Sequence, residues 1–209
     1  LYCHVESLEL GIDEDATLEP PSPYEREGSL VLYGTSITQG ACASRPGLCY
    51  TSILSRKLNL ETYNFGFSGN GLGEPEVVEM LAEIENPLLY LLDYEANAGG
   101  NGRLEQSLEQ MIRRLRSAHP ETPVAVASKI PYIFEMLDSE KGAERERLHR
   151  FQRDTARRLN AELGWVFFID GQELLPAEHL ALVAHQAEQQ LVLSGREGHQ
   201  TAAHRAGPA

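Results

Sequence analysis

The stretch LVLYGTSITQG, residues 30–40, decides the fold class, because a short apolar run ends there in a turn of small residues. Such a run, closed by turn residues, is typical of a buried strand. Gly34 and Gly40 bracket the turn, and glycine lets the backbone bend sharply or approach a ligand closely. Ser36 follows the strand at its carboxyl end, where open α/β sheets bind their ligands. A serine that only caps a helix is the alternative interpretation.

The rest of the chain alternates expected strands with expected helices. Further strands are predicted to begin near Glu61, Leu88, Pro123 and Trp165. Helical spacing of apolar residues or a charged helical pattern predicts helices over 46–58, 74–84, 103–118, 139–163 and 177–193. Strands separated by helices indicate βαβ units with right-handed crossovers. We therefore predict an α/β fold with a five-stranded parallel sheet and helices on both of its faces.

Two more expected strands end in residues that can donate hydrogen bonds. The turn NFGFSGNG at 64–71 contains Gly69, which offers an unobstructed backbone N–H, and the segment LLYLLDYEAN at 88–97 ends in the side-chain amide of Asn97. Acyl transfer needs such donors where negative charge develops. A turn glycine and a turn cap are the structural alternatives for these two residues.

These three blocks resemble those of the SGNH (GDSL-type) hydrolases. Gly34-Thr35-Ser36 is similar to the first family block, GFSG at 66–69 to the second, and DYEAN at 93–97 to the third. The resemblance covers about residues 30–171. It implies a three-layer α/β/α, flavodoxin-like fold and ester hydrolysis without a metal or cofactor, with Ser36 as the nucleophile. The backbone of Gly69 and the amide of Asn97 would hold the oxyanion.

The fourth family block, Asp-x-x-His near the C-terminus, is not found in this sequence. In the family its histidine is the general base and its aspartate orients that histidine. The nearest echo is EGH at 197–199, which is one residue short and has Glu in place of Asp, so His199 is the candidate base. Glu146 and His149 have the required spacing, but they lie in a charged helical run and are interpreted as an exposed helix pair. Without a well-placed base, we expect weak or absent activity.

Composition limits the partners. The chain of 209 residues carries 31 acidic and 18 basic residues, a net charge of −13, which argues against nucleic acid and anionic membrane surfaces. No apolar stretch approaches the ~20 residues that span a bilayer. We expect a soluble domain that binds a small-molecule or carbohydrate ester. Its three cysteines show neither metal-ligand spacing nor a disulfide framework.

The ends of the chain differ from its centre. Residues 1–28 are interpreted as a remnant strand and linker from a preceding β-sandwich domain, because the chain begins with Leu1, residues 5–12 alternate like a strand, and residues 13–28 are acidic and proline-rich. That interpretation also follows one branch of the SGNH family, in which a small β-sandwich precedes the hydrolase domain. Residues 29–194 are expected to form the hydrolase-like domain, and residues 195–209 an atypical or disordered tail.

Taken together, these features predict a serine esterase that hydrolyses a small ester, such as an O-acyl group on a carbohydrate, through an acyl-enzyme. Two alternatives stay open. A relative without the general base would be catalytically impaired, or would bind carbohydrate without catalysis. A flavodoxin-like anion or nucleotide binder would use the glycine-rich turn at 66–73 ahead of a helix, although Glu74 would repel a phosphate.

Overall fold

The computed structural model describes residues 6–41 and 43–174. They fall into two compact units. One consists of the residues up to Lys129 together with Leu148–Ile169, and the other of Ile130–Arg147 together with the residues from Asp170 onward. The first unit contains the whole sheet and all the contacts discussed below.

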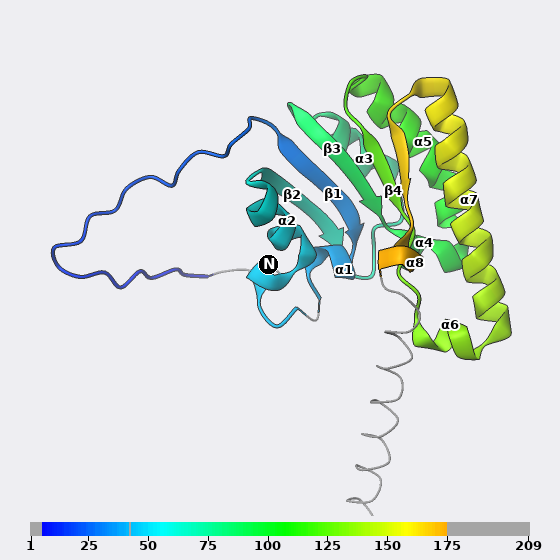
Figure 1. The fold of residues 1–209 in the computed structure, drawn as a ribbon, viewed down its shortest axis with the longest axis horizontal. Helices are drawn as coiled ribbons and strands as arrows, with labels where there is room; N and C mark the ends of the chain where they lie inside the picture. Colours follow the sequence, from blue (N-terminus) through cyan, green and yellow to red (C-terminus); the bar gives the residue numbers. More distant parts are fainter. Residues whose placement is uncertain (1–5, 42, 175–209) are drawn as a thin grey trace, which may run out of the picture. The chain divides into compact units, whose positions relative to one another are not determined.

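The sheet has five parallel strands in the order β2-β1-β3-β4-β5, which confirms the predicted fold class (Figure 1). The strands are β1 (Ser29–Thr35), β2 (Glu61–Phe67), β3 (Pro87–Asp93), β4 (Val124–Ala127) and β5 (Val166–Ile169). In register, Gly34 of β1 lies opposite Gly66 of β2 and Asp93 of β3. The carboxyl ends of these three neighbouring strands are therefore level with one another.

Helices cover both faces of this sheet, as predicted (Figure 1). Alternate side chains of a strand point to opposite faces. Leu30 and Leu32 of β1 belong to a core that includes Tyr50 and Leu54 of α2 (Tyr50–Leu58). Val31 and Tyr33 of the same strand pack on the opposite face against two helices, α3 (Pro75–Ala82) and α5 (Arg103–Ala118).

The amphipathic pattern of α5 explains most of the larger core. Five of its apolar residues recur at helical spacing and are each at most 1% exposed: Leu104, Leu108, Met111, Ile112 and Leu115. Burying a side chain of this size stabilises a fold by about 1.5–3 kcal/mol. The remaining helices are α1 (Ser36–Gln39), η1 (Pro46–Leu48), α4 (Glu95–Ala98), η2 (Gly99–Asn101), α6 (Ile133–Leu137), α7 (Ser139–Leu163) and α8 (Gly171–Leu174).

One expectation about α7 is wrong. His149 is only 8% exposed, and its ring meets the ring of Phe168 edge-on with 5.2 Å between centroids. The interpretation as an exposed helix pair failed because charged residues flank the buried stripe of α7 and hide its period. That stripe consists of Leu148, His149, Gln152, Thr155, Ala156 and Leu159.

No strand forms within residues 6–28, whose side chains are almost all exposed. A strand at this position has no described neighbour to pair with, so its origin in a preceding β-sandwich stays a prediction. The helix expected over 177–193 and the tail at 195–209 lie outside the described residues.

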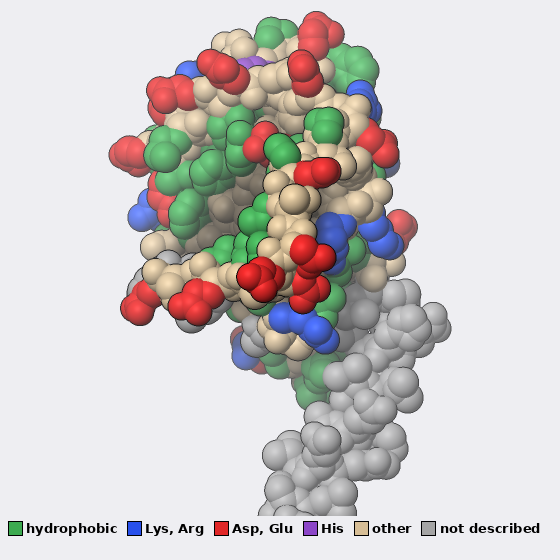
Figure 2. All heavy atoms as spheres, turned by 90° about the vertical axis from the view of Figure 1, so that its left-hand side faces the viewer, with side chains coloured by type: hydrophobic (Ala, Val, Ile, Leu, Met, Phe, Trp, Pro, Cys, Tyr) green, Lys and Arg blue, Asp and Glu red, His purple; other side chains and the backbone are tan. Residues whose placement is uncertain are grey.

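The surface reflects the composition of the chain. On the face shown in Figure 2, acidic side chains predominate over basic ones, in agreement with the net charge of −13. Within residues 6–41 and 43–174, no helix combines the length and the apolar character needed to cross a membrane.

Candidate active site

Ser36 is the first residue of α1, directly after the central strand β1. The helix starts there because the side chain of Thr35 caps it, accepting a hydrogen bond from the Ile37 amide at 3.3 Å. The helix folds back so tightly that a Cβ on Gly34 would collide with the Thr38 hydroxyl and with the Asp93 carbonyl. Glycine at position 34 is therefore a steric requirement. Ser36 is half-buried, and no residue in the described part of the chain hydrogen-bonds to its hydroxyl.

Gly69 lies in the turn after β2, and this turn packs against the end of β1. Gly69 itself has φ of +70° and is exposed, with open space where a Cβ would be. Two residues later, Gly71 has φ of +74°, and a Cβ there would collide with the Gly34 carbonyl oxygen. Left-handed backbone in this turn suits glycine, and the turn can approach β1 only because position 71 lacks a side chain.

Asn97 lies in α4, the short helix after β3, and contacts the same turn. Its Nδ2 donates a hydrogen bond to the carbonyl oxygen of Asn70. From the other side, the Gln39 Oε1 of α1 accepts a hydrogen bond from the Ser68 amide at 3.1 Å. The turn that contains Gly69 is thus bound both to the helix of Ser36 and to the helix of Asn97.

The three residues predicted from the sequence therefore occupy the same edge of the sheet. The physical reason is the register, since Ser36, Gly69 and Asn97 each follow one of three adjacent strands whose carboxyl ends are level. His199, the candidate base, lies outside the described residues.

The half-buried carboxyl group of Asp93 restrains α1. The Tyr50 hydroxyl lies 3.1 Å from both Asp93 Oδ2 and Thr38 Oγ1, and the Thr38 hydroxyl lies 3.3 Å from Asp93 Oδ2. Burial raises the pKa of Asp93, and the hydrogen bonds from Tyr50 and Thr38 only partly oppose this effect. Because Thr38 is fully buried and stands two residues after Ser36, this cluster restrains the helix that presents the serine.

A second carboxylate fixes the Gly69 turn. Tyr33 of β1 is fully buried, and its hydroxyl donates to Glu74 Oε2 at 2.6 Å while accepting from the Gly73 amide at 2.7 Å. The same Glu74 oxygen accepts from the Leu72 amide at 3.1 Å. Burial raises the pKa of Glu74, but these hydrogen bonds outweigh burial and leave the pKa below its ordinary value. The ionised carboxylate therefore closes the turn against β1.

A third carboxylate fixes α4. Glu95 is 2% exposed, and its Oε2 accepts hydrogen bonds from the Lys129 amide at 2.7 Å and from Gln152 Nε2 at 2.8 Å. Burial raises the pKa of Glu95, against the effect of these hydrogen bonds. Glu95 thereby connects the helix of Asn97 to the segment after β4 and to α7.

The sequence analysis missed these supporting residues. Tyr33 and Glu74 are 41 positions apart in the sequence, and Thr38 and Asp93 are 55 apart. No local sequence pattern therefore links either pair. The position of Thr38 two residues after the candidate nucleophile was the one signal available for it.

A parallel α/β sheet with serine, glycine and asparagine at one carboxyl edge is the arrangement that the resemblance to SGNH hydrolases implies. The sequence profile of the GDSL-like Lipase/Acylhydrolase family matches residues 27–192. This chain therefore belongs to that family.

Solved structures are also similar to this chain. A protein from Bacteroides ovatus ATCC 8483, described as a GDSL-like lipase, is 29% identical, with a TM-score of 0.71, and the match covers 80% of this chain and 49% of that one. The salicylyl-acyltransferase SsfX3 from a tetracycline biosynthetic pathway is 18% identical, with a TM-score of 0.61 and coverage of 74% and 44%. A family two carbohydrate esterase from Clostridium thermocellum is 15% identical, with a TM-score of 0.56 and coverage of 73% and 56%.

The last two likenesses concern the fold alone. This chain spans about half the length of each of the three solved proteins. No curated protein matches it significantly.

Proposed function

We propose that this protein hydrolyses small esters, such as an O-acyl group on a carbohydrate, with Ser36 as the nucleophile. The observation that carries the proposal is the binding of the Gly69 turn to both neighbouring helices, through Gln39 and through Asn97. Membership of the GDSL-like Lipase/Acylhydrolase family supports the same class of reaction.

In the proposed mechanism, the Ser36 hydroxyl oxygen attacks the ester carbonyl carbon and loses its proton to a general base. The backbone N–H groups of Ser36 and Gly69 and the amide of Asn97 stabilise the oxyanion that forms. Collapse of this intermediate breaks the bond to the alcohol, which leaves with a proton, and forms an acyl-enzyme. Water then attacks the acyl-enzyme and releases the carboxylic acid and free Ser36.

The hydrogen bond of Asn97 supports its role as a donor. A primary amide carries two N–H groups, so Asn97 can bind Asn70 with one and offer the other to the oxyanion. Removing one oxyanion donor typically lowers kcat by about 10²–10³.

The base in this proposal is His199, on the strength of its echo of the fourth family block. Its spacing departs from the family pattern, so we expect slow hydrolysis. A site with its oxyanion donors but no effective base retains only the residual rate that those donors supply.

Covalent labelling tests the proposal. A fluorophosphonate probe should label the wild-type protein slowly, and peptide mass spectrometry should place the label on Ser36. Ser36→Ala should abolish labelling, whereas Ser117→Ala, which changes an exposed serine of α5, should label like the wild type. Absence of labelling after prolonged incubation, or equal labelling of Ser36→Ala, would refute a nucleophilic Ser36 and favour a non-catalytic binding protein.

A further inference from the structure

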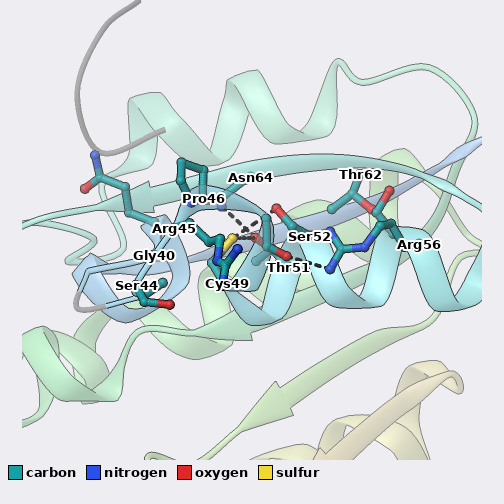
Figure 3. A pocket seen from close by; sticks show the side chains of 14 residues that line it. Gly40, Ser44, Arg45, Pro46, Cys49, Thr51, Ser52, Arg56, Thr62 and Asn64 are labelled. Carbon is teal, nitrogen blue, oxygen red and sulfur yellow. Dashed lines mark hydrogen bonds between the residues drawn. The ribbon is translucent and has the colours of Figure 1, made fainter.

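A pocket of about 540 Å³ lies between the edge strand β2, the helix α2 and the segment that precedes α2 (Figure 3). Hydroxyl groups supply much of its polar lining, from Ser44, Thr51, Ser52, Ser55 and Thr62. The side chains of Thr51 and Ser52 gather at its middle, with Thr62 towards one end (Figure 3). The proposed reaction does not use any of these groups.

The charge of this pocket is opposite to that of the protein. Among the described residues, its lining contains two arginines, Arg45 and Arg56, and no aspartate or glutamate, although the chain carries 31 acidic residues against 18 basic ones. Neither arginine forms an ion pair with any described residue, whereas Arg113 and Arg114 each pair with a glutamate at 2.6 Å and 2.7 Å. Two uncompensated positive charges beside one concave surface attract small anions.

Both arginines are connected to the short helix η1, Arg56 through its side chain and Arg45 through its backbone. Arg56 Nη2 donates to the Gly47 carbonyl at 2.6 Å, which leaves further N–H groups of the guanidinium for a ligand. Arg45 precedes Pro46, and its carbonyl accepts a hydrogen bond from the Leu48 amide at 2.9 Å. A guanidinium matches the paired oxygens of a carboxylate or phosphate. The part of the lining that the structure describes has no aromatic side chain on which a flat ring could stack, so a compact anion fits it better than a nucleobase.

Gln39 connects this pocket to the proposed active site. It lines the pocket and ends α1, three residues after Ser36, and positions three apart lie on the same side of a helix. Its Oε1 also accepts the hydrogen bond from Ser68, the residue before Gly69. One side chain thus belongs both to the pocket wall and to the support of the Gly69 turn, so the pocket adjoins the proposed active site at Gln39.

We infer that this pocket binds a small oxyanionic group, a carboxylate or phosphate, carried by the ester substrate. That the anion is part of a substrate rests on the proposed function, but the pocket's affinity for an anion can be measured without any hydrolysis. Arg45 and Arg56 are assigned to binding that group, and Gln39 to the passage between pocket and Ser36.

Calorimetric titration with inorganic phosphate and with succinate tests the anion site directly. The wild-type protein should bind at least one of them, and the double variant Arg45→Gln/Arg56→Gln should bind it at least tenfold more weakly. The matched control is Arg150→Gln/Arg157→Gln, which removes the same charge from exposed positions of α7 and should stay within twofold of wild type. Equal weakening in both double variants, or no binding to the wild type, would overturn the inference. If the pocket variant fails to fold by circular dichroism, the single variant Arg45→Gln takes its place.

A kinetic comparison tests whether the anion is part of the substrate. The ratio of kcat/KM for mono-(4-nitrophenyl) succinate over 4-nitrophenyl acetate should fall at least tenfold in the pocket variant and stay unchanged in the α7 control. An unchanged ratio in the pocket variant would refute a substrate role for the pocket. Anion binding that depends on Arg45 and Arg56 in a wild-type protein that hydrolyses neither ester would support the anion site and refute the proposed function. Hydrolysis by a protein that shows no such anion binding would support the proposed function and refute the anion site.

Discussion

Replacing Tyr33 by phenylalanine is expected to loosen the turn that contains Gly69. The Tyr33 hydroxyl bridges Glu74 Oε2 at 2.6 Å and the Gly73 amide at 2.7 Å, inside a core where Tyr33 is fully buried. Phenylalanine keeps the ring and its packing against Phe67 and Tyr94, so the substitution removes only the bridge. The Gly73 N–H then loses its partner and the Glu74 carboxylate loses one donor.

The expected cost follows from these two contacts. A hydrogen bond to a charged group contributes about 1.5–3 kcal/mol, and a buried N–H left without a partner costs about 1–3 kcal/mol. Because the two contacts share one hydroxyl, we do not add the extremes and expect a loss of about 2–4 kcal/mol in the free energy of unfolding. For a chain of this size that loss corresponds to roughly 4–16 °C in Tm.

The cost should also depend on pH. The pKa of Glu74 in the folded protein lies below its ordinary value of 4.5, because hydrogen bonds outweigh burial. A carboxyl with a lowered folded pKa stabilises the protein above its unfolded pKa, and this contribution is lost as the pH falls through the folded pKa. The difference between wild type and Tyr33→Phe should therefore be fully present at pH 7 and should narrow below pH 4.5.

Urea unfolding followed by circular dichroism measures both effects. The matched control is Tyr63→Phe. Tyr63 is 39% exposed, and its hydroxyl lies 3.3 Å from Glu61 Oε2. Removing this exposed hydroxyl should lower the free energy of unfolding by less than about 0.5 kcal/mol. Equal stabilities for Tyr33→Phe and Tyr63→Phe at pH 7 would refute the bridge. A difference that persists unchanged into acid would refute the role assigned to ionised Glu74.

Three further predictions concern the site and its core. Gly71→Ala should destabilise the protein by roughly 2 kcal/mol or more in urea unfolding, because the new Cβ collides with the Gly34 carbonyl. Gly69→Ala has a similar φ but open space around the new Cβ, so it should cost only the left-handed strain of about 1 kcal/mol. Equal costs for the two variants would contradict this packing. Burial raises the pKa of Asp93 above its ordinary 3.8, so the folded state binds this proton more tightly than the unfolded state, and stability should decline as the pH rises through the folded pKa. Asp93→Asn should flatten this decline when unfolding is measured from about pH 4 to 8. Parallel stability profiles for the variant and the wild type would exclude Asp93 as the source of the decline. Leu108→Ala, in the fully buried stripe of α5, should cost about 2–5 kcal/mol by the same assay, and a cost below 1 kcal/mol would show that this core is not tightly packed.

Local patterns in the sequence were sufficient for the fold class and for three candidate site positions. Short runs followed by turn residues located the five strands. Helical spacing located α5 and a charged helical pattern located α7, both at the bounds that the structure shows. Because parallel strands bring their carboxyl ends to one edge, the sequence alone places Ser36, Gly69 and Asn97 at that edge. These patterns work because strand and helix periods are properties of short segments.

Only the tertiary structure decided which distant residues support those positions. Tyr33 meets Glu74 and Asp93 meets Tyr50 across 41 and 43 positions, and the sign of charge around Arg45 depends on which side chains line the pocket with it. The burial of His149 likewise depends on the face that α7 turns toward Phe168. Periodicity reports that a segment has an apolar or polar face, but hydrogen bonds and local charge depend on which other segment packs against that face, and this is set by the sheet order and register of the whole fold.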